Sequence, residues 1–387
     1  MGLNKIKTLF IAHSGDGYGA NRSLLDILCG LDRDRFELYL IAGSRGFVTE
    51  KAAASGIPVY IERFRRWTRI QWYSPALLNF FVNVFSAIRI AILARRLNIA
   101  LIYTNTGGVL SGALAARLAG IKHIWHVREA VSERPFEFKI IDRLSDLIIA
   151  NSQATRERFA EAVQPKIKVV YNDFQVPPKM DIKERAAAKS RAGFNDQIIL
   201  TIVGNIYEKK GQKEAVMAMP EILKRFPRTK LVIVGQSYGH THQYESEVRG
   251  LISSLHISEN VLMLGFKENM SEIYGFTDIL LVASQHEAFG RAIVEAMLHQ
   301  VPVVATNVGG IPEIIEHGKT GVLLKDCDPH SIAQGVIHLL ENPGERATMA
   351  EAGRDSVAGR FAMAKTISEI EKYLVKVVGQ NGGGPRS

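Results

Sequence analysis

The segment HEAFGRAIVE, residues 286–295, contains two glutamates eight positions apart, Glu287 and Glu295. Two carboxylates can be the acid and base of a hydrolase, or they can accept hydrogen bonds from the hydroxyl groups of a sugar. An apolar run at 278–284 predicts a buried strand before the segment, and a helix is expected to begin near Gly290. Glu287 is then in a loop and Glu295 one to two turns inside the helix, about 80° around its axis. We therefore expect both carboxylates to face one cleft at different depths.

A second loop of interest is VGNIYEKKGQKEAV, residues 203–216, in which Lys209, Lys210 and Gly211 come before a helix. Ammonium charge beside a helix N-terminus suits a diphosphate. The loop is not a Walker A sequence, which needs GxxxxGK followed by Ser or Thr. A solvated lysine pair is the alternative interpretation.

The first apolar run of the chain is followed by HSGDGYGANRS, with glycines at 15, 17 and 19 before an amphipathic helix. Glycine lets a ligand approach the backbone, and a helix N-terminus offers N–H groups to an anion. The spacing is not GxGxxG, and no acidic residue ends the second strand, which argues against an NAD-dependent oxidoreductase. An ordinary glycine-rich turn remains the alternative.

Two further strand ends carry polar groups. VGGIPE, residues 308–313, predicts a tight turn and another helix start, and WHVRE, residues 125–129, places His126 at the end of a strand. A structural and a catalytic role for this histidine are equally compatible with the sequence.

Metal and disulfide chemistry have little support. The two DxD sequences, 32–34 and 326–328, are interpreted as turns, with Asp328 capping a helix before Pro329. Cys29 and Cys327 form no CxxC pair, which is typical of a reduced, cytoplasmic environment. We therefore predict no metal site and no cofactor.

Short apolar runs alternate with helical patterns along nearly the whole chain, which predicts parallel sheets covered on both faces. The rhythm restarts after Pro177–Pro178, so two doubly wound α/β domains are expected, at 1–175 and 176–363. An amphipathic helix is predicted at 364–378 and a flexible tail at 379–387. The predicted strands are 7–13, 36–43, 58–62, 100–105, 122–127, 147–152 and 168–172 in the first half, and 198–204, 230–235, 261–265, 278–284 and 301–306 in the second.

With these elements in place, EAFGRAIVE resembles the E-x-F-G-x(4)-E sequence of the retaining group 1 glycosyltransferases, also called glycosyltransferase family four. The resemblance extends from the glycine loop to the C-terminal helix and includes the VGGIPE turn. It implies the GT-B fold, in which two Rossmann-like domains face each other across an interdomain cleft, the N-terminal one on the acceptor side. The return helix at 364–378 would join the N-terminal domain.

The resemblance also implies roles for individual residues. Glu287 and His126 would be catalytic, at the donor sugar, and Glu295 would hold the ribose hydroxyls. Lys210 would bind the diphosphate, while Asn205 stands where the family commonly has an arginine. The remaining donor-binding residues implied by the family are Gly17, Gly19, Lys267, Phe289, Gly290, Arg291 and Ala292.

The implied reaction transfers a sugar, with retention of configuration, from a UDP-, GDP- or ADP-sugar to a glycan or lipid-linked acceptor. Lys210 and helix N-termini would stabilise the leaving diphosphate without a metal. Cell-surface polysaccharide or lipopolysaccharide synthesis is the expected setting. A glycoside hydrolase would not need the Lys210 loop or the second domain. An inactive family member that binds a nucleotide sugar or glycan is the remaining alternative.

The N-terminal half carries the basic excess: residues 1–180 have 25 Lys and Arg against 15 Asp and Glu, whereas residues 181–387 have 23 against 24. Much of the excess lies in 60–96, with seven arginines and one acidic residue. The same segment contains an apolar stretch at 76–94, whose length is borderline for a membrane span. We predict peripheral contact with the anionic inner face of the cytoplasmic membrane rather than nucleic-acid binding; a core helix beside a solvated basic loop is the alternative. The surface residues assigned to this contact are Arg65, Arg66, Trp67, Arg69 and Trp72.

Overall fold

The computed structural model describes residues 5–65, 76–129 and 135–379. The chain forms two compact units: unit 1 comprises Met1–Asp173 and Met363–Ser387, and unit 2 comprises Phe174–Ala362. The predicted boundaries, at 175/176 and 363/364, lie within two residues of this division.

Unit 1 contains a parallel sheet of seven strands in the order β3-β2-β1-β4-β5-β6-β7. Its central strands are buried along nearly their whole length, because helices cover both faces. The strand order reverses between β1 and β4, which is where ligands of such sheets bind. The strands are β1 (Ile6–Ala12), β2 (Phe36–Ala42), β3 (Val59–Ile61), β4 (Leu101–Thr104), β5 (Lys122–Val127), β6 (Leu147–Ala150) and β7 (Ile167–Val169).

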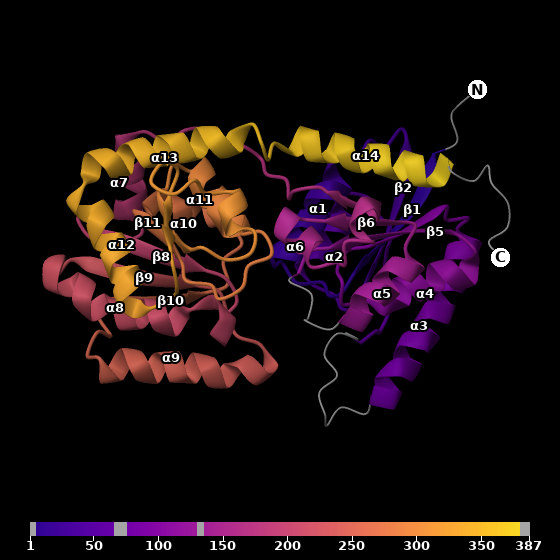
Figure 1. Cartoon of the computed structure of the whole chain (residues 1–387), viewed down its shortest axis with the longest axis horizontal. Helices are drawn as coiled ribbons and strands as arrows, with labels where there is room; N and C mark the ends of the chain where they lie inside the picture. The colour runs from indigo at the N-terminus through magenta and orange to yellow at the C-terminus, as the bar shows by residue number, and fades with distance from the viewer. Residues whose placement is uncertain (1–4, 66–75, 130–134, 380–387) are drawn as a thin grey trace. The chain divides into compact units, whose positions relative to one another are not determined.

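The C-terminal helix α14 (Met363–Gly379) packs on unit 1 although it follows unit 2 in the chain (Figure 1). Ile367, Ile370 and Leu374 are buried in the same core cluster as residues of the first strands and helices. Glu371 adds polar contacts, because its carboxylate accepts the Asp32 N–H and pairs with Arg35. The other helices are α1 (Gly19–Gly30), α2 (Phe47–Ala54), α3 (Ala76–Arg96), α4 (Leu110–Ala119), α5 (Pro135–Leu144), α6 (Gln153–Glu157) and the 3₁₀ turn η1 (Gln164–Lys166).

Unit 2 contains a parallel sheet of six strands in the order β10-β9-β8-β11-β12-β13, and this order reverses between β8 and β11. The sequence prediction missed β13. The strands are β8 (Ile198–Val203), β9 (Thr229–Val234), β10 (Val261–Gly265), β11 (Ile279–Val282), β12 (Val303–Thr306) and β13 (Val322–Leu324).

Two helices of unit 2, α12 and α7, begin at capping side chains. Asp328 accepts the backbone N–H groups of His330 and Ser331, as expected for an N-cap, and Asp181 forms a capping box with Glu184. The helices are α7 (Ile182–Arg191), α8 (Gln212–Arg225), α9 (His242–Ser254), α10 (Met270–Phe276), α11 (Arg291–Leu298), α12 (Pro329–Glu341) and α13 (Pro343–Ala358), with 3₁₀ turns η2 (Glu208–Lys210), η3 (Gly239–Thr241) and η4 (Ile311–Glu313). Both units are thus doubly wound α/β folds, which confirms the predicted fold class.

Candidate active site

Opposite charges meet at the strand reversal of unit 2. Lys210 lies in the loop after β8 and Glu287 in the loop after β11, and the Lys210 Nζ donates to Glu287 Oε2 at 2.5 Å. Both side chains are largely but not fully buried, at 21% and 17% exposed. Burial by itself would lower the pKa of Lys210, but the Glu287 carboxylate and Tyr207 outweigh it, so this pKa is raised. Lys210 is therefore a firmly protonated cation at the sheet edge.

Backbone contacts fix the Lys210 loop against the end of β11. Gly211, the residue before α8, has φ 71°, and a Cβ there would lie 2.0 Å from the Ala283 carbonyl oxygen. The Gln285 N–H donates to the Lys209 carbonyl at 2.9 Å. Only glycine allows this approach, so the KKG sequence is required to bring the lysine beside Glu287.

The VGGIPE turn holds the backbone of Glu287 from the other side. The Gly310 N–H donates to the Glu287 carbonyl at 3.0 Å. Gly309 has φ 55°, and a Cβ there would lie 1.9 Å from the same carbonyl oxygen. The two glycines after β12 therefore position the catalytic candidate, a role the sequence did not reveal.

Helix α11 begins after Gly290, whose φ of 108° suits glycine, and carries the second glutamate. Glu295 accepts from Arg291 at 3.3 Å and from the Tyr274 hydroxyl at 3.1 Å. Glu287 and Glu295 thus have different partners, and Tyr274 on α10 is a contact that the sequence did not indicate. Ala292 lies in the first turn, and its carbonyl faces the same tyrosine hydroxyl at 3.4 Å.

Phe289 belongs to an aromatic cluster. Its ring is buried, stacks on Phe174 at 6.3 Å between centroids and meets Phe361 edge-on at 5.3 Å. The Arg291 guanidinium lies over Phe174 at 4.5 Å from the ring centroid. The Phe289 side chain is therefore structural, which leaves its backbone for any ligand.

The other donor-binding candidates of unit 2 lie in loops of the same sheet. Asn205 follows Gly204 after β8, and its carbonyl accepts from the Gln212 side chain at 2.9 Å. Its buried Oδ1 has no hydrogen-bond partner among the described residues. Lys267 follows β10 and is exposed.

In unit 1, His126 is buried in β5 with one ring nitrogen satisfied. Its Nδ1 pairs with the Tyr103 hydroxyl, while its Nε2 has no hydrogen-bond partner among the described residues. Burial, and secondarily the Arg128 charge, lowers the pKa of His126 well below its usual range. The histidine is therefore neutral at physiological pH.

Arg128 is a buried cation beside this histidine. Its Nε donates to Asn105 Oδ1 at 2.6 Å, and its Nη1 donates to Asn172 Oδ1. The three residues follow β4, β5 and β7, so they converge on one edge of the sheet. Arg128 belongs to the WHVRE segment, but its pairing with Asn172 was not predicted because it joins residues 44 positions apart.

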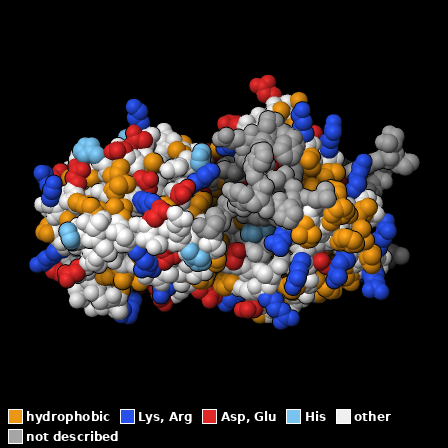
Figure 2. Space-filling model, turned by 90° about the horizontal axis from the view of Figure 1, so that it is seen from below, with side chains coloured by type: hydrophobic (Ala, Val, Ile, Leu, Met, Phe, Trp, Pro, Cys, Tyr) orange, Lys and Arg blue, Asp and Glu red, His pale blue; other side chains and the backbone are white. Residues whose placement is uncertain are grey.

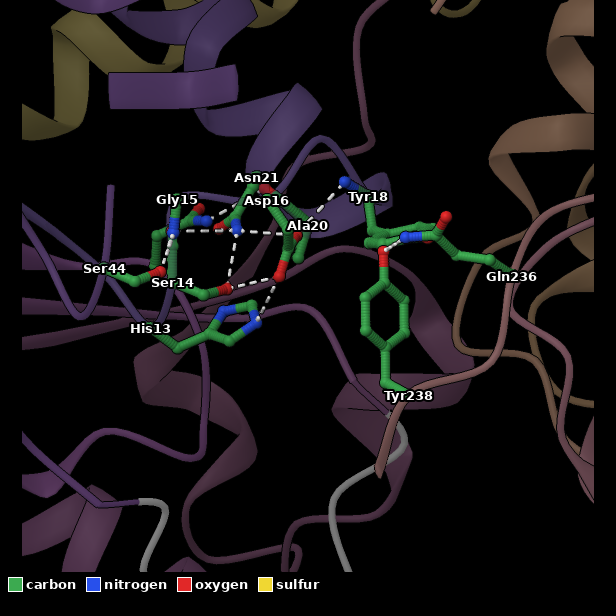
Figure 3. A network of polar contacts seen from close by, with 11 residues as sticks. His13, Ser14, Gly15, Asp16, Tyr18, Ala20, Asn21, Ser44, Gln236 and Tyr238 are labelled. Atoms are coloured by element: carbon green, nitrogen blue, oxygen red, sulfur yellow. Dashed lines mark hydrogen bonds and ion pairs between the residues drawn. The ribbon is translucent and has the colours of Figure 1, made fainter. Parts of the chain in front are cut away.

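The glycine loop is held by a polar network (Figure 3). Asp16 accepts from Ser14 at 2.5 Å, from the Tyr18 N–H at 3.2 Å and from Asn21 at 3.0 Å. Gly17 is buried, and its carbonyl accepts from Arg22 at 2.7 Å. The loop ends at Gly19, which begins α1, and the Ala20 carbonyl accepts from the Asn105 side chain at 2.9 Å.

Of the predicted membrane-contact residues, only Arg65 is described. Its side chain is exposed, and its backbone N–H donates to Asn83 at 2.9 Å. Arg66, Trp67, Arg69 and Trp72 lie outside the described residues. Within the described ranges, one helix, Leu78–Arg96, is long and apolar enough to cross a membrane by length and composition. No group of three or more His, Cys, Asp or Glu in those ranges could hold a metal ion.

Two family models match the chain. The model for glycosyl transferases group 1 covers residues 184–356, and the model for glycosyltransferase family 4 covers residues 18–172. The chain therefore belongs to the group 1 glycosyltransferases, as its EAFGRAIVE segment indicated.

Individual relatives match only part of the chain at modest identity. The chain is 32% identical over 245 residues to N-acetyl-alpha-D-glucosaminyl L-malate synthase of Bacillus anthracis, covering 62% of each protein. It is 29% identical over 226 residues to the GDP-mannose-dependent alpha-(1-6)-phosphatidylinositol monomannoside mannosyltransferase of Mycolicibacterium smegmatis, covering 54% of this chain and 57% of that protein. The matches thus span somewhat more than half the length of these relatives.

Among solved structures, the chain resembles Anabaena HepE in complex with UDP and glucose. The TM-score is 0.83 at 25% identity, and the match covers 95% of this chain and 99% of HepE. The fold is accordingly GT-B.

Proposed function

We propose that this protein transfers a sugar, with retention of configuration, from a nucleotide-diphosphate sugar to a hydroxyl of a glycan or lipid-linked acceptor. The observation that carries the proposal is the Lys210–Glu287 pair at the strand reversal of unit 2. The diphosphate of a donor can pair with Lys210 in place of Glu287, and the freed Glu287 carboxylate can accept hydrogen bonds from sugar hydroxyls.

The donor diphosphate is proposed to bind Lys210 and the N-termini of α8 and α11. Both helices begin after glycines with positive φ, at 211 and 290, so the preceding loops turn sharply into the helix N-termini, where N–H groups can bind an anion. In α8 the Lys213 N–H already donates to the Tyr244 hydroxyl at 3.2 Å. Lys210 and these helix ends would neutralise the departing diphosphate, so the proposal needs no metal. Asn205 adds a dipole but no charge, which would make donor binding depend more strongly on Lys210.

Glu287 is proposed to exchange Lys210 for a donor-sugar hydroxyl and to stabilise positive charge that develops on the sugar. Glu295, already oriented by Arg291 and Tyr274, is proposed to accept from the ribose hydroxyls. The acceptor hydroxyl would attack from the face that the diphosphate leaves, and a phosphate oxygen would take its proton. The family resemblance assigns His126 to the donor sugar, and its Nε2, which has no hydrogen-bond partner within the described part of the chain, supports that assignment.

A UDP-sugar is the first donor to test, because HepE, which resembles nearly the whole chain, is seen with UDP, UDP-glucose and glucose. A GDP-sugar is the second, because the M. smegmatis relative is named for GDP-mannose. The proposed acceptors belong to cell-surface polysaccharide or lipopolysaccharide synthesis. Contact with the inner face of the cytoplasmic membrane would bring the enzyme to a lipid-linked acceptor.

A thermal-shift panel of UDP-, GDP- and ADP-sugars tests donor binding. A ligand at 100 times its dissociation constant stabilises the folded state by about 2.7 kcal/mol, which is easily measured. Addition of EDTA should leave the shift unchanged. Silence across the panel would contradict the proposal.

NMR of the product made from a donor of known anomeric configuration then tests retention. The inactive-member alternative predicts a nucleotide shift without transfer to any acceptor, and an inverted product would contradict the retaining mechanism.

A further inference from the structure

The outer face of α3 is apolar. Leu78, Phe81, Phe85, Ile88 and Ile92 are between 42% and 66% exposed. Their spacing of alternately three and four residues places them within about 80° of one another around the helix. We call these five residues the α3 stripe. Figure 2 shows hydrophobic side chains gathered with Lys and Arg on the face that carries α3.

The polar residues of α3 point the opposite way. Asn83 and Ser86 are buried, at 3% and 2% exposed. The Asn83 side chain accepts from the Arg65 N–H at 2.9 Å and from Ser111 at 3.3 Å, and Ser86 donates to the Arg63 carbonyl. This helix therefore has buried amide and hydroxyl groups on its inner side and exposed large apolar groups on its outer side, where an ordinary surface helix carries polar residues.

Arginines border the stripe. Arg89, Arg95 and Arg96 lie within about 20° of the angular range of the stripe, and all three are exposed. The hydrogen bonds of Asn83 and Ser86 also tie the segment 62–65, which follows β3, to the helix, and that segment exposes Arg63 and Arg65. Helix α3 itself contains no acidic residue, and the nearby Glu62 pairs with Arg89 at 2.8 Å.

The inner face of α3 excludes a membrane-spanning role within this fold. Ala87, Ile90, Ala91 and Ala94 are buried in a core cluster that also contains residues of β1 and β2. A spanning helix would have to leave that core and expose it to water, together with its hydrogen-bonded Asn83 and Ser86. A helix buried on one side and apolar on the other can instead lie in the plane of a membrane interface.

The arginines that border the α3 stripe indicate what kind of partner the stripe binds. A second copy of this chain docked on the stripe would bring its own arginines toward the same rim, where like charges repel. An anionic lipid surface accepts both the apolar side chains and the arginines.

We propose that α3 lies flat on an anionic bilayer, with the α3 stripe inserted among the lipids and Arg63, Arg65, Arg89, Arg95 and Arg96 at the headgroups. This inference deepens the membrane contact proposed above, and it is independent of sugar transfer.

Vesicle co-sedimentation of the full chain tests the inference. The vesicles are phosphatidylcholine mixed with phosphatidylglycerol, or phosphatidylcholine alone. Wild type should bind the anionic vesicles, more weakly as salt is raised. The stripe variant Phe81→Ser/Phe85→Ser/Ile88→Ser should bind at least about tenfold more weakly, because each inserted side chain contributes to partitioning.

Phe80→Ser is the matched control, because Phe80 is a 57% exposed apolar residue of the same helix that points about 120° away from the centre of the stripe. It should bind as wild type does. Arg95→Glu/Arg96→Glu should lose binding to anionic vesicles at least about tenfold, since about 1 kcal/mol accompanies each basic residue near the surface. Circular dichroism melts establish that all variants are folded.

Absence of wild-type binding to anionic vesicles would overturn the inference, as would equal binding by the folded stripe variant. Light scattering after size exclusion addresses the other occupant. A dimer that the stripe variant dissociates, without vesicle binding, would assign the stripe to a second copy. Because no sugar is present, these outcomes are separate from the fate of the proposed transfer reaction.

Discussion

The two units have the same kind of parallel sheet with one reversal of strand order, yet the polar groups near the two reversals differ. In unit 2, Lys210 and Glu287 form a partly accessible ion pair. In unit 1, His126 is a neutral, buried histidine, next to an arginine bonded to two amide side chains. The same topology therefore supports either charges that can exchange partners or a buried network, and the degree of burial distinguishes the two.

The largest effect is expected at the Lys210–Glu287 ion pair of unit 2. Lys210→Met should lower the transfer rate about 10²- to 10³-fold, because a positioned donor to the developing charge on the leaving group is lost. Lys213→Met is the control, since Lys213 on α8 pairs with Glu247 rather than with Glu287. Steady-state kinetics should show a change of less than about threefold for Lys213→Met. Equal effects of the two substitutions would remove the distinction between site and surface lysines.

A second prediction concerns the turn that fixes Glu287. Gly309→Ala should unfold at lower denaturant and lose transfer, because the left-handed conformation costs about 1–2 kcal/mol and overlap with the Glu287 carbonyl adds about 1–3 kcal/mol. Gly318→Ala has a similar positive φ, 74°, with nothing within 4 Å of the added Cβ, so only the first cost applies. Denaturant titration and transfer assays compare the two. Matching losses would mean that the VGG turn does not position the glutamate.

A third prediction tests the neutral state of the histidines in unit 1. Burial lowers the pKa of His123 to about 3, and that of His126 is also lowered, so the unfolded chain binds protons near pH 6.5 that the folded chain does not. The contribution of these two histidines to the free energy of unfolding is fully present above pH 6.5. It declines as the pH falls, by up to about 1.4 kcal/mol per pH unit for each histidine. Denaturant titrations between pH 6.5 and 5 give the slope of the unfolding free energy against pH. His123→Gln should reduce this slope by the equivalent of about one proton taken up on unfolding.

The control for that slope is in unit 2. Hydrogen bonding to Glu221 raises the pKa of His330, so its contribution is present below pH 6.5 and declines as pH rises through the raised pKa. His330→Gln should therefore change the slope in the opposite direction to His123→Gln. A slope unchanged by His123→Gln would show that this histidine is protonated in the folded chain.

The smallest effect is expected at a surface ion pair of unit 2. Asp196 and Arg228 pair while both are more than two-thirds exposed. Asp196→Asn should change the free energy of unfolding by less than about 0.5 kcal/mol, because solvent screens such pairs. A loss as large as that of Gly309→Ala would mean that accessibility does not separate the two kinds of ion pair in unit 2.

The sequence predicted much of the fold because continuous apolar runs mark buried parallel strands. The helix predicted at 364–378 is observed as Met363–Gly379, since its apolar residues repeat at helical spacing over several turns. Strand β13, Val322–Leu324, was missed, although β3 and β7, which are equally short, were predicted. Helix α3 was expected to be buried or interfacial, but the residues that face outward could not be predicted. Its Asn83 and Ser86 are buried because they form hydrogen bonds with the backbone of Arg65 and Arg63.

For the candidate site, the sequence by itself determined which chemical groups follow each strand: two glutamates, a lysine before a glycine, and a histidine. These are local facts, encoded by residue type and spacing. Only the tertiary structure decided that Lys210 pairs with Glu287 while Glu295 is held by Arg291 and Tyr274, and that His126 is buried and neutral beside Arg128. Those outcomes depend on strand order and burial, since both bring together residues that are distant in the chain.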